Sequence, residues 1–209
     1  ALALPVDTFH LDLVRCPSQL DDILKSGKLA SSANLSLGVV DGRNIWKNDF
    51  RNSLALIKKA IDVLGKDRVL IAPSCSLIHS PCDLDLETND ETLSPEIKQW
   101  LAFAKQKVNE VVLLKQFASD EISIQNSIEF QRNIIANDTR KRSELIHNEK
   151  VKLRISGISV NDDKRKNNFA TRRKSQIEAL DLPLFPTTTI GSFPQTAEVR
   201  SWRDKFKKG

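Results

Sequence analysis

The sequence has no methionine, no tyrosine and only three cysteines in 209 residues. Because Cys16, Cys75 and Cys82 are odd in number and form no Cys-x-x-Cys pair, a disulfide framework is not expected. Reduced thiols fit a cytoplasmic protein, which is the location that we predict. The chain opens with Ala1 inside an apolar segment and ends at Gly209 directly after a helical pattern, so we expect truncation at both ends.

Long apolar runs are also absent. No stretch approaches the roughly 18 apolar residues that span a bilayer, and residues 1–6 lack the basic leader of a signal peptide. Seven glycines and eight prolines are too few for a collagen-like chain, while 28% charged and 40% hydrophobic residues are typical of a globular protein. We therefore expect a globular protein without a membrane partner.

The net charge of +5 is concentrated in one segment. Residues 132–174 hold thirteen Lys or Arg against five Asp or Glu, which suggests a nucleic-acid-binding module as an alternative function. However, Phe169 is the only aromatic residue there, and no zinc-finger, RNP or helix-turn-helix signature is present. A solvated helical linker that binds no nucleic acid is the preferred interpretation.

Short β-like runs alternate with helical runs over the first half of the chain, which is the pattern of an α/β protein with a parallel sheet. Strands are predicted at residues 10–14, 35–40 and 69–72, and helices at 48–64 and 94–117. In the second helix the core-facing stripe is assigned to Ile97, Leu101, Ala104, Val108 and Val111. The spacing of the strands suits either a (β/α)8 barrel or a doubly wound sheet.

The second half begins with a polar stretch, residues 118–180, whose apolar spacing is helical. Two prolines, Pro183 and Pro186, then favour extended backbone. The β-branched run at residues 187–190 predicts a strand, and Thr196 is placed to cap a following helix. Strand, loop and helix together indicate the first unit of a new βα domain.

Several long motifs in order resemble the cobalamin-independent methionine synthases. The similar segments are HLDLVR at 10–15, VDGRNIW at 40–46, PSCSLIHSP at 73–81, RRKSQ at 172–176 and PTTTIGSFPQT at 186–196. The resemblance implies two (β/α)8 barrels. Residues 1–118 would form the C-terminal part of the first barrel, 119–180 a basic interdomain linker, and 181–209 the start of the catalytic barrel.

The resemblance also implies an activity: zinc-dependent transfer of a methyl group from 5-methyltetrahydropteroyltriglutamate to homocysteine, which forms methionine. In this family the zinc ligands are a His, two Cys and a Glu on later strands of the catalytic barrel, so they would lie outside this chain. We expect a monomer whose isolated residues 1–209 bind no zinc and transfer no methyl group.

The residues Ile190, Gly191 and Ser192 match the family segment that binds the amino-acid part of homocysteine. A glycine at the end of a strand lets a ligand approach the backbone, and neighbouring N–H groups can receive its carboxylate. The alternative interpretation is an ordinary turn at the end of a strand.

A second metal site, made from Cys75, His79 and Cys82, is a weaker hypothesis. Zinc requires three or four suitably placed ligands, and His10-x-Asp12 on the first strand lacks the cysteine of the catalytic copy. A degenerate site that survives as packing is the preferred interpretation.

The polar loop that contains Asp41, Gly42 and Arg43 follows the second predicted strand. One interpretation is turn chemistry, with Gly42 at a positive φ. The functional interpretation is that Arg43 contacts the acidic glutamate tail of the folate.

Overall fold

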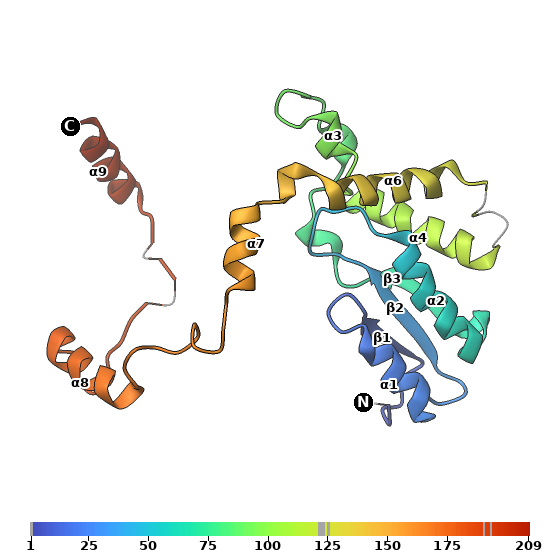
Figure 1. Cartoon of the computed structure of the whole chain (residues 1–209), viewed down its shortest axis with the longest axis horizontal. Helices are drawn as coiled ribbons and strands as arrows, with labels where there is room; N and C mark the ends of the chain where they lie inside the picture. Colours follow the sequence, from blue (N-terminus) through green and yellow to red (C-terminus); the bar gives the residue numbers. More distant parts are fainter. Residues whose placement is uncertain (1, 121–123, 125, 190, 193) are drawn as a thin grey trace. The chain divides into compact units, whose positions relative to one another are not determined.

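The computed structural model describes residues 2–120, 124, 126–189, 191–192 and 194–209. The chain divides into two compact units, residues 1–148 and residues 149–209, called here the N-terminal and C-terminal units (Figure 1). Among the described helices, none combines the length and apolarity needed to cross a membrane.

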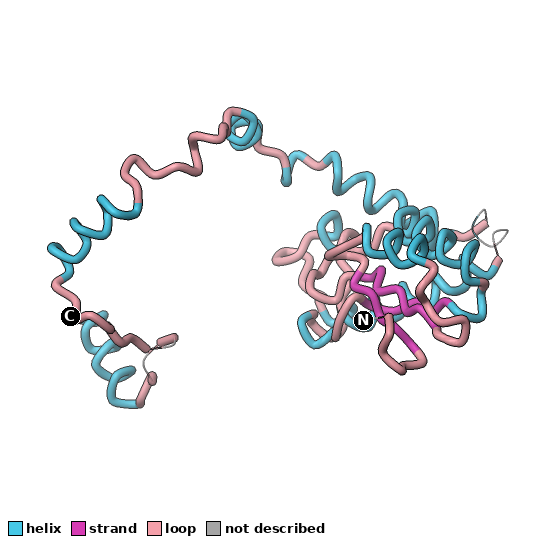
Figure 2. Tube along the Cα trace, turned by 90° about the horizontal axis from the view of Figure 1, so that it is seen from below, coloured by secondary structure: helices cyan, strands magenta, loops and turns pink. Residues whose placement is uncertain are grey.

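A three-stranded parallel sheet forms the centre of the N-terminal unit (Figure 2). Its strands are β1 (Thr8–Asp12), β2 (Asn34–Val40) and β3 (Val69–Pro73), in the spatial order β1-β2-β3. The helices α1 (Ser18–Ser26) and α2 (Phe50–Leu64) connect them. All three predicted strands and the first predicted helix are confirmed, with ends that differ by one or two residues.

One face of the sheet carries the core. Leu11, Leu35 and Leu37 are buried on this face, where α2 and the later helix α4 (Ala104–Ser119) pack against β2 and β3. Side chains alternate along a strand, so the neighbouring positions point to the opposite face. On that face His10 and Leu70 are exposed, which leaves a polar and partly apolar surface uncovered.

The predicted helix at 94–117 is wrong in one respect, because the structure has two helices there. These are α3 (Pro95–Lys98) and α4, separated by a turn at residues 99–100 and a short non-helical stretch. Between these helices, Trp100 accepts a hydrogen bond from Lys47 N at 2.8 Å, and Ala102 N donates to Ile45 O at 2.8 Å. Residues 100–103 are all buried. Four consecutive buried side chains do not fit on one face of a helix, whereas a stretch packed on both sides buries them all.

The predicted core-facing stripe is confirmed only in part: Leu101 is buried, and Val111 on α4 packs against the core. The buried residues of this helix are Lys107, Glu110, Leu114 and Phe117, whereas Val108 is 52% exposed. Compared with the predicted orientation, α4 is rotated about its axis. As a result, the charged side chains of Lys107 and Glu110 face the core, at the spacing that apolar core residues usually have.

The helix α6 (Ile128–Arg142) belongs to the N-terminal unit although it lies in the basic segment. Its Phe130 ring packs 5.5 Å from the ring of Phe117 and 6.3 Å from that of Phe50. Contacts therefore extend this unit to residue 148. The assignment of 1–118, 119–180 and 181–209 to barrel, linker and second barrel stays a prediction. Short 3-10 helices complete the unit at Lys66–Arg68, Leu77–His79, Leu84–Leu86 and Glu144–Ile146.

The C-terminal unit contains α7 (Glu149–Ser156), α8 (Phe169–Leu180) and α9 (Ala197–Lys208), and none of its described residues is buried. The predicted cap is confirmed, since Thr196 Oγ1 accepts from Val199 N at 3.3 Å. The predicted strand at 187–190 is not confirmed: residues 187–189 are not in a strand, and Ile190 lies outside the described residues. A strand requires a paired neighbour, and no described residue pairs with this segment.

Candidate functional site

On the uncovered face of the sheet, the His10 side chain on β1 connects the neighbouring strands. Its Nδ1 lies 2.9 Å from Ser36 Oγ on β2, and its Nε2 lies 3.2 Å from Ser74 O, directly after β3. A carbonyl oxygen can only accept, so Nε2 carries the proton and Nδ1 accepts from the Ser36 hydroxyl in the neutral ring. His10 therefore has a structural role that links all three strands.

The loops after β2 and β3 touch at Gly42. Its N–H donates to Ser74 Oγ at 3.2 Å, and an added Cβ would lie 2.8 Å from Cys75 O and 3.0 Å from Cys75 Sγ. The predicted positive φ at Gly42 is wrong, because the positive φ values occur at other glycines. Glycine is required here by the close approach of the Cys75 backbone.

Arg43 lies in a loop fixed by Asp41. One Asp41 oxygen accepts from Arg43 N at 2.8 Å, and the other accepts from Asn44 Nδ2 at 2.8 Å. The Arg43 side chain is exposed. Its contact with a folate tail stays a prediction.

The three residues of the hypothetical second metal site lie on the loop after β3. Cys75 is half-buried against Gly42, His79 ends a 3-10 helix, and Cys82 is exposed. The Asp12 carboxylate is used in a turn, where its Oδ1 accepts hydrogen bonds from Val14 N and Arg15 N. Within the described part of the chain, no group of three His, Cys, Asp or Glu residues is placed to hold a metal.

A buried charged cluster was missed by the sequence reasoning. Lys107 is fully buried, and its Nζ donates to Asn44 Oδ1 at 3.1 Å and to Trp46 O at 3.0 Å, so it holds the loop after β2. Burial lowers the pKa of Lys107 and raises that of Glu110 to about 7. The only signal in the sequence is their spacing with Leu114 and Phe117 on one face of α4.

Asn48 connects three elements around this cluster. Its N–H donates to Glu110 Oε1 at 2.9 Å, and its Nδ2 donates to Val39 O at the end of β2 at 2.8 Å. Its carbonyl accepts from Asn133 at 2.7 Å and from Asn137 at 3.0 Å, both on α6. The loop that leads from β2 into α2 is therefore fixed by β2, α4 and α6 at once.

A cavity of about 380 Å³ lies beside this loop. Its walls come from the segments after β1 and β2, the start of α2 and the end of α6. In α/β folds, ligands bind at the carboxyl ends of parallel strands, and this volume is within the usual range for small-molecule sites. Arg140 lies over the Trp46 ring there, 4.3 Å from its centroid.

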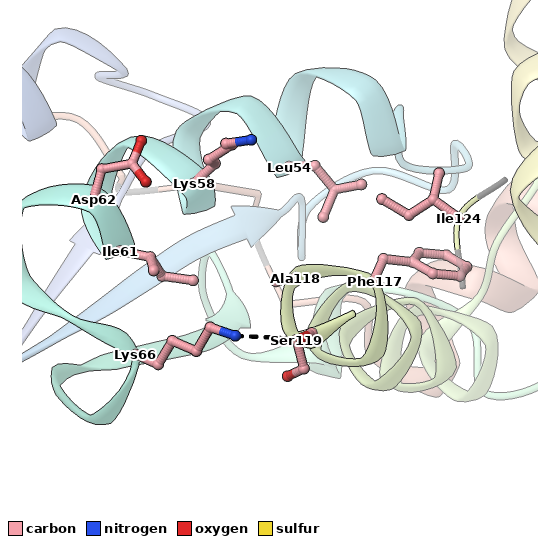
Figure 3. A pocket seen from close by; sticks show the side chains of 9 residues that line it. All are labelled: Leu54, Lys58, Ile61, Asp62, Lys66, Phe117, Ala118, Ser119 and Ile124. Atoms are coloured by element: carbon pink, nitrogen blue, oxygen red, sulfur yellow. Dashed lines mark hydrogen bonds between the residues drawn. The ribbon is translucent and has the colours of Figure 1, made fainter. Parts of the chain in front are cut away.

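A smaller cavity of about 240 Å³ lies between α2 and α4 (Figure 3). It is closed at one end by Lys66 Nζ, which donates to Ser119 O at 3.3 Å. Ile61 and Lys66 belong to the end of α2 and the approach to β3, so this cavity lies at the amino end of the strand. Its mostly aliphatic and aromatic walls indicate a packing gap between helices.

The predicted homocysteine segment lies in the C-terminal unit. Gly191 has φ of 83°, and its carbonyl accepts from Thr189 Oγ1 at 3.0 Å. A Cβ at Gly191 would meet nothing within 4 Å, so the backbone conformation alone favours glycine there. Ser192 is exposed, and Ile190 is outside the described residues.

Two family models match the chain. Residues 1–65 match the cobalamin-independent synthase N-terminal domain, and residues 185–209 match the cobalamin-independent synthase catalytic domain. The two matches occur in the order expected from the sequence motifs.

Curated relatives match the whole chain. A Flavobacterium johnsoniae protein is 78% identical over 209 residues, and one from Cytophaga hutchinsonii is 55% identical over 209 residues. A Saccharomyces cerevisiae protein is 44% identical over 206 residues, or 99% of the chain. Each is named 5-methyltetrahydropteroyltriglutamate–homocysteine methyltransferase, and the chain spans only 26–27% of their lengths. By these matches, the chain belongs to the cobalamin-independent methionine synthase family.

Proposed function

We propose that this chain is part of a zinc-dependent methyltransferase that moves a methyl group from 5-methyltetrahydropteroyltriglutamate to homocysteine. The observation that carries the proposal is the 78% identity, over every residue of the chain, to a relative whose name states this donor and acceptor. Because the chain corresponds to 27% of that relative, the reaction is assigned to a longer protein that includes these residues. We place that protein in the cytoplasm, as a monomer.

The N-terminal unit is proposed to be the last part of a (β/α)8 barrel. The strand order β1-β2-β3 follows the sequence without a reversal, as it does around a barrel, and helices pack on one face only. A doubly wound sheet reverses its strand order and has helices on both faces. The sequential order therefore favours the barrel.

Substrate contacts are proposed in both units. Gly191 and Ser192, with Ile190, would bind the amino-acid part of homocysteine, and the left-handed backbone at Gly191 supports this because such turns expose N–H groups to anions. Arg43 would contact the glutamate tail of the folate, and its exposed side chain is free to do so.

Zinc does not fit the described residues of this chain, which lack a cluster of three ligands. We therefore assign the zinc ligands to residues outside the chain and derive no chemical step from residues 1–209. The isolated chain should hold no stoichiometric zinc and transfer no methyl group, which metal analysis and a methyl-transfer assay would check. One tightly bound zinc that disappears in Cys75→Ser would contradict this.

The proposed function itself is tested with a chimaera. This chain replaces the matching 27% of the Flavobacterium johnsoniae protein, and methyl transfer to homocysteine is measured. We expect activity within about threefold of the unaltered relative. A folded chimaera without activity would count against a shared reaction.

Gly191→Ala in this chimaera should raise KM for homocysteine about tenfold, because alanine at a positive φ costs roughly 1 kcal/mol or more. The matched control is Gly157→Ala, where an added Cβ meets its nearest atoms at 3.5 Å and 3.7 Å. Equal KM values in both variants would remove Gly191 from the proposed site.

The nucleic-acid-binding alternative has no support from the relatives or from the basic residues that end α6. Arg140 lies on Trp46, Lys141 Nζ contacts Asp49 Oδ2 at 3.0 Å, and Arg142 Nε donates to Asp138 O at 3.2 Å. These three cations are used within the N-terminal unit.

A further inference from the structure

The cavity of about 380 Å³ contains a cation without an anionic partner. Arg140 is half-buried, and its Cζ lies over the Trp46 ring, 4.3 Å from the centroid. A contact with an aromatic face does not use the N–H donors of a guanidinium. Within the described part of the chain, no carboxylate forms an ion pair with Arg140. Burial alone lowers the pKa of Arg140, with no opposing effect from a nearby acid.

The same cavity contains a carboxylate that forms no ion pair with a described residue, although its field acts on the buried Lys107. Asp41 accepts only from Arg43 N and Asn44 Nδ2, so its negative charge is hydrogen-bonded but not neutralised by an ion pair among the described residues. Asp41 and Arg140 both line the cavity, and they do not pair with each other.

The other two charged groups on the cavity wall have opposite charges nearby. Asp49 forms ion pairs with Arg51 at 3.3 Å and with Lys141 at 3.0 Å. The field of Glu110 acts on Lys47 and partly offsets the effect of its burial. Asp41 likewise has an opposite charge, that of Lys107, only at longer range. Asp41 and Arg140 are therefore an anion and a cation on the cavity wall that form no ion pair and that an incoming ligand can contact.

The remaining wall of the cavity is partly polar, with side chains such as Asn52 and Ser53, and partly apolar. Aliphatic side chains from the segment after β1, from β2 and from α2 contribute to it: Leu13, Val14, Pro17, Val39 and Leu56. A bound molecule that neutralises both charges would also find a surface for a short hydrocarbon chain.

We propose that this cavity binds a free α-amino acid with an aliphatic side chain, whose carboxylate contacts Arg140 and whose ammonium contacts Asp41. Carboxylates suit the guanidinium fork because two parallel hydrogen bonds form. A folate glutamate tail supplies carboxylates without a free ammonium, so it satisfies only half of the site. The site is thus separate from the proposed contacts of homocysteine with Gly191 and Ser192.

The test uses residues 1–209 and three probes: L-norvaline, pentanoate, which lacks the ammonium, and butylamine, which lacks the carboxylate. Binding is followed by NMR at the indole N–H of Trp46, with the indole of Trp100, which donates to Thr139 at 3.0 Å, as internal reference. We expect saturable binding of L-norvaline and at least about tenfold weaker binding of the other two probes.

Arg140→Gln and Asp41→Asn should each weaken L-norvaline binding about tenfold. Arg142→Gln is the matched control on the same helix, because Arg142 does not line the cavity, and it should leave binding unchanged. Should Asp41→Asn unfold, the comparison of L-norvaline with pentanoate still tests the ammonium contact. No saturable shift up to about 10 mM, or equal binding of L-norvaline and pentanoate, would overturn the proposal.

Discussion

Replacing Phe50 by alanine should lower the free energy of unfolding of the N-terminal unit by about 3–5 kcal/mol. Phe50 is only 2% exposed, and its ring packs 5.7 Å from that of Phe117 on α4 and 6.3 Å from that of Phe130 on α6. Truncation would remove the buried ring and leave a cavity where α2, α4 and α6 meet. Aromatic contacts of this kind add to the loss from burial alone.

Urea unfolding of the whole chain, followed by circular dichroism, measures this loss. Phe169→Ala is the matched control, since Phe169 is 64% exposed in the C-terminal unit and the same truncation should cost little there. Phe130→Ala alone and combined with Phe50→Ala tests the attachment of α6. If α6 belongs to the unit, the two losses should differ from additivity by about 0.5–1.5 kcal/mol. Strict additivity would argue that α6 is only loosely attached.

The strands and α2 could be predicted because their sequence patterns and their surroundings agree. Residues 69–73 form a short apolar run, and α2 has a regular apolar stripe followed by Gly65, whose N–H donates to Ile61 O at 2.8 Å. The N-cap at Thr196 is equally local, since one side chain and one N–H determine it. Local chemistry of this kind does not depend on distant residues.

Features that depend on distant residues could not be predicted. The break before α4 exists because Trp100 and Ala102 pair with the segment of Ile45 and Lys47, more than 50 positions earlier in the sequence. Gly42 is required because Cys75 approaches it from the loop after β3. Likewise, the cavity at Arg140 joins residues from both ends of the N-terminal unit, and no sequence pattern brings those residues together.

The buried charges of α4 were missed for a different reason. Charged residues are almost never fully buried unless they are paired, so the core-facing stripe was assigned to apolar residues and does not include Lys107 or Glu110. In the structure, Lys107 is fully buried and makes two hydrogen bonds to the loop after β2, and Glu110 accepts one from Asn48. Their partners come from a loop about 60 residues away, and the polar contacts that compensate their burial are invisible in the sequence of the helix.

Glu110 should make the N-terminal unit less stable as the pH rises. Burial raises its pKa from 4.5 to about 7, against the hydrogen bond from Asn48 and the charges of Lys107 and Lys47. The folded unit thus holds this proton more tightly than the unfolded chain does. The stabilisation is fully present below about pH 4.5 and is lost as the pH rises through 7, with a total of about 3 kcal/mol at pH 8.

Glu110→Gln should remove this dependence, because an amide does not ionise and its oxygen can still accept from Asn48 N. Urea unfolding is measured for both proteins at several values between pH 4.5 and pH 8. The other carboxylates titrate in both proteins, so the difference between the two curves isolates Glu110. We expect the variant to gain about 3 kcal/mol relative to the wild type between these limits, whatever fixed offset the amide introduces.

The control for this experiment is Glu129→Gln, because Glu129 is exposed but lines, together with Glu110, another cavity of about 240 Å³, distinct from the one in Figure 3. It should leave the pH dependence of the wild type in place. A constant difference between Glu110→Gln and wild type at every pH would show that the pKa of Glu110 is the same in the folded unit and in the unfolded chain. In that case Lys107 and Lys47 compensate its burial fully, and the Oε2 atom, which has no hydrogen-bond partner among the described residues, is stabilised by their charges alone.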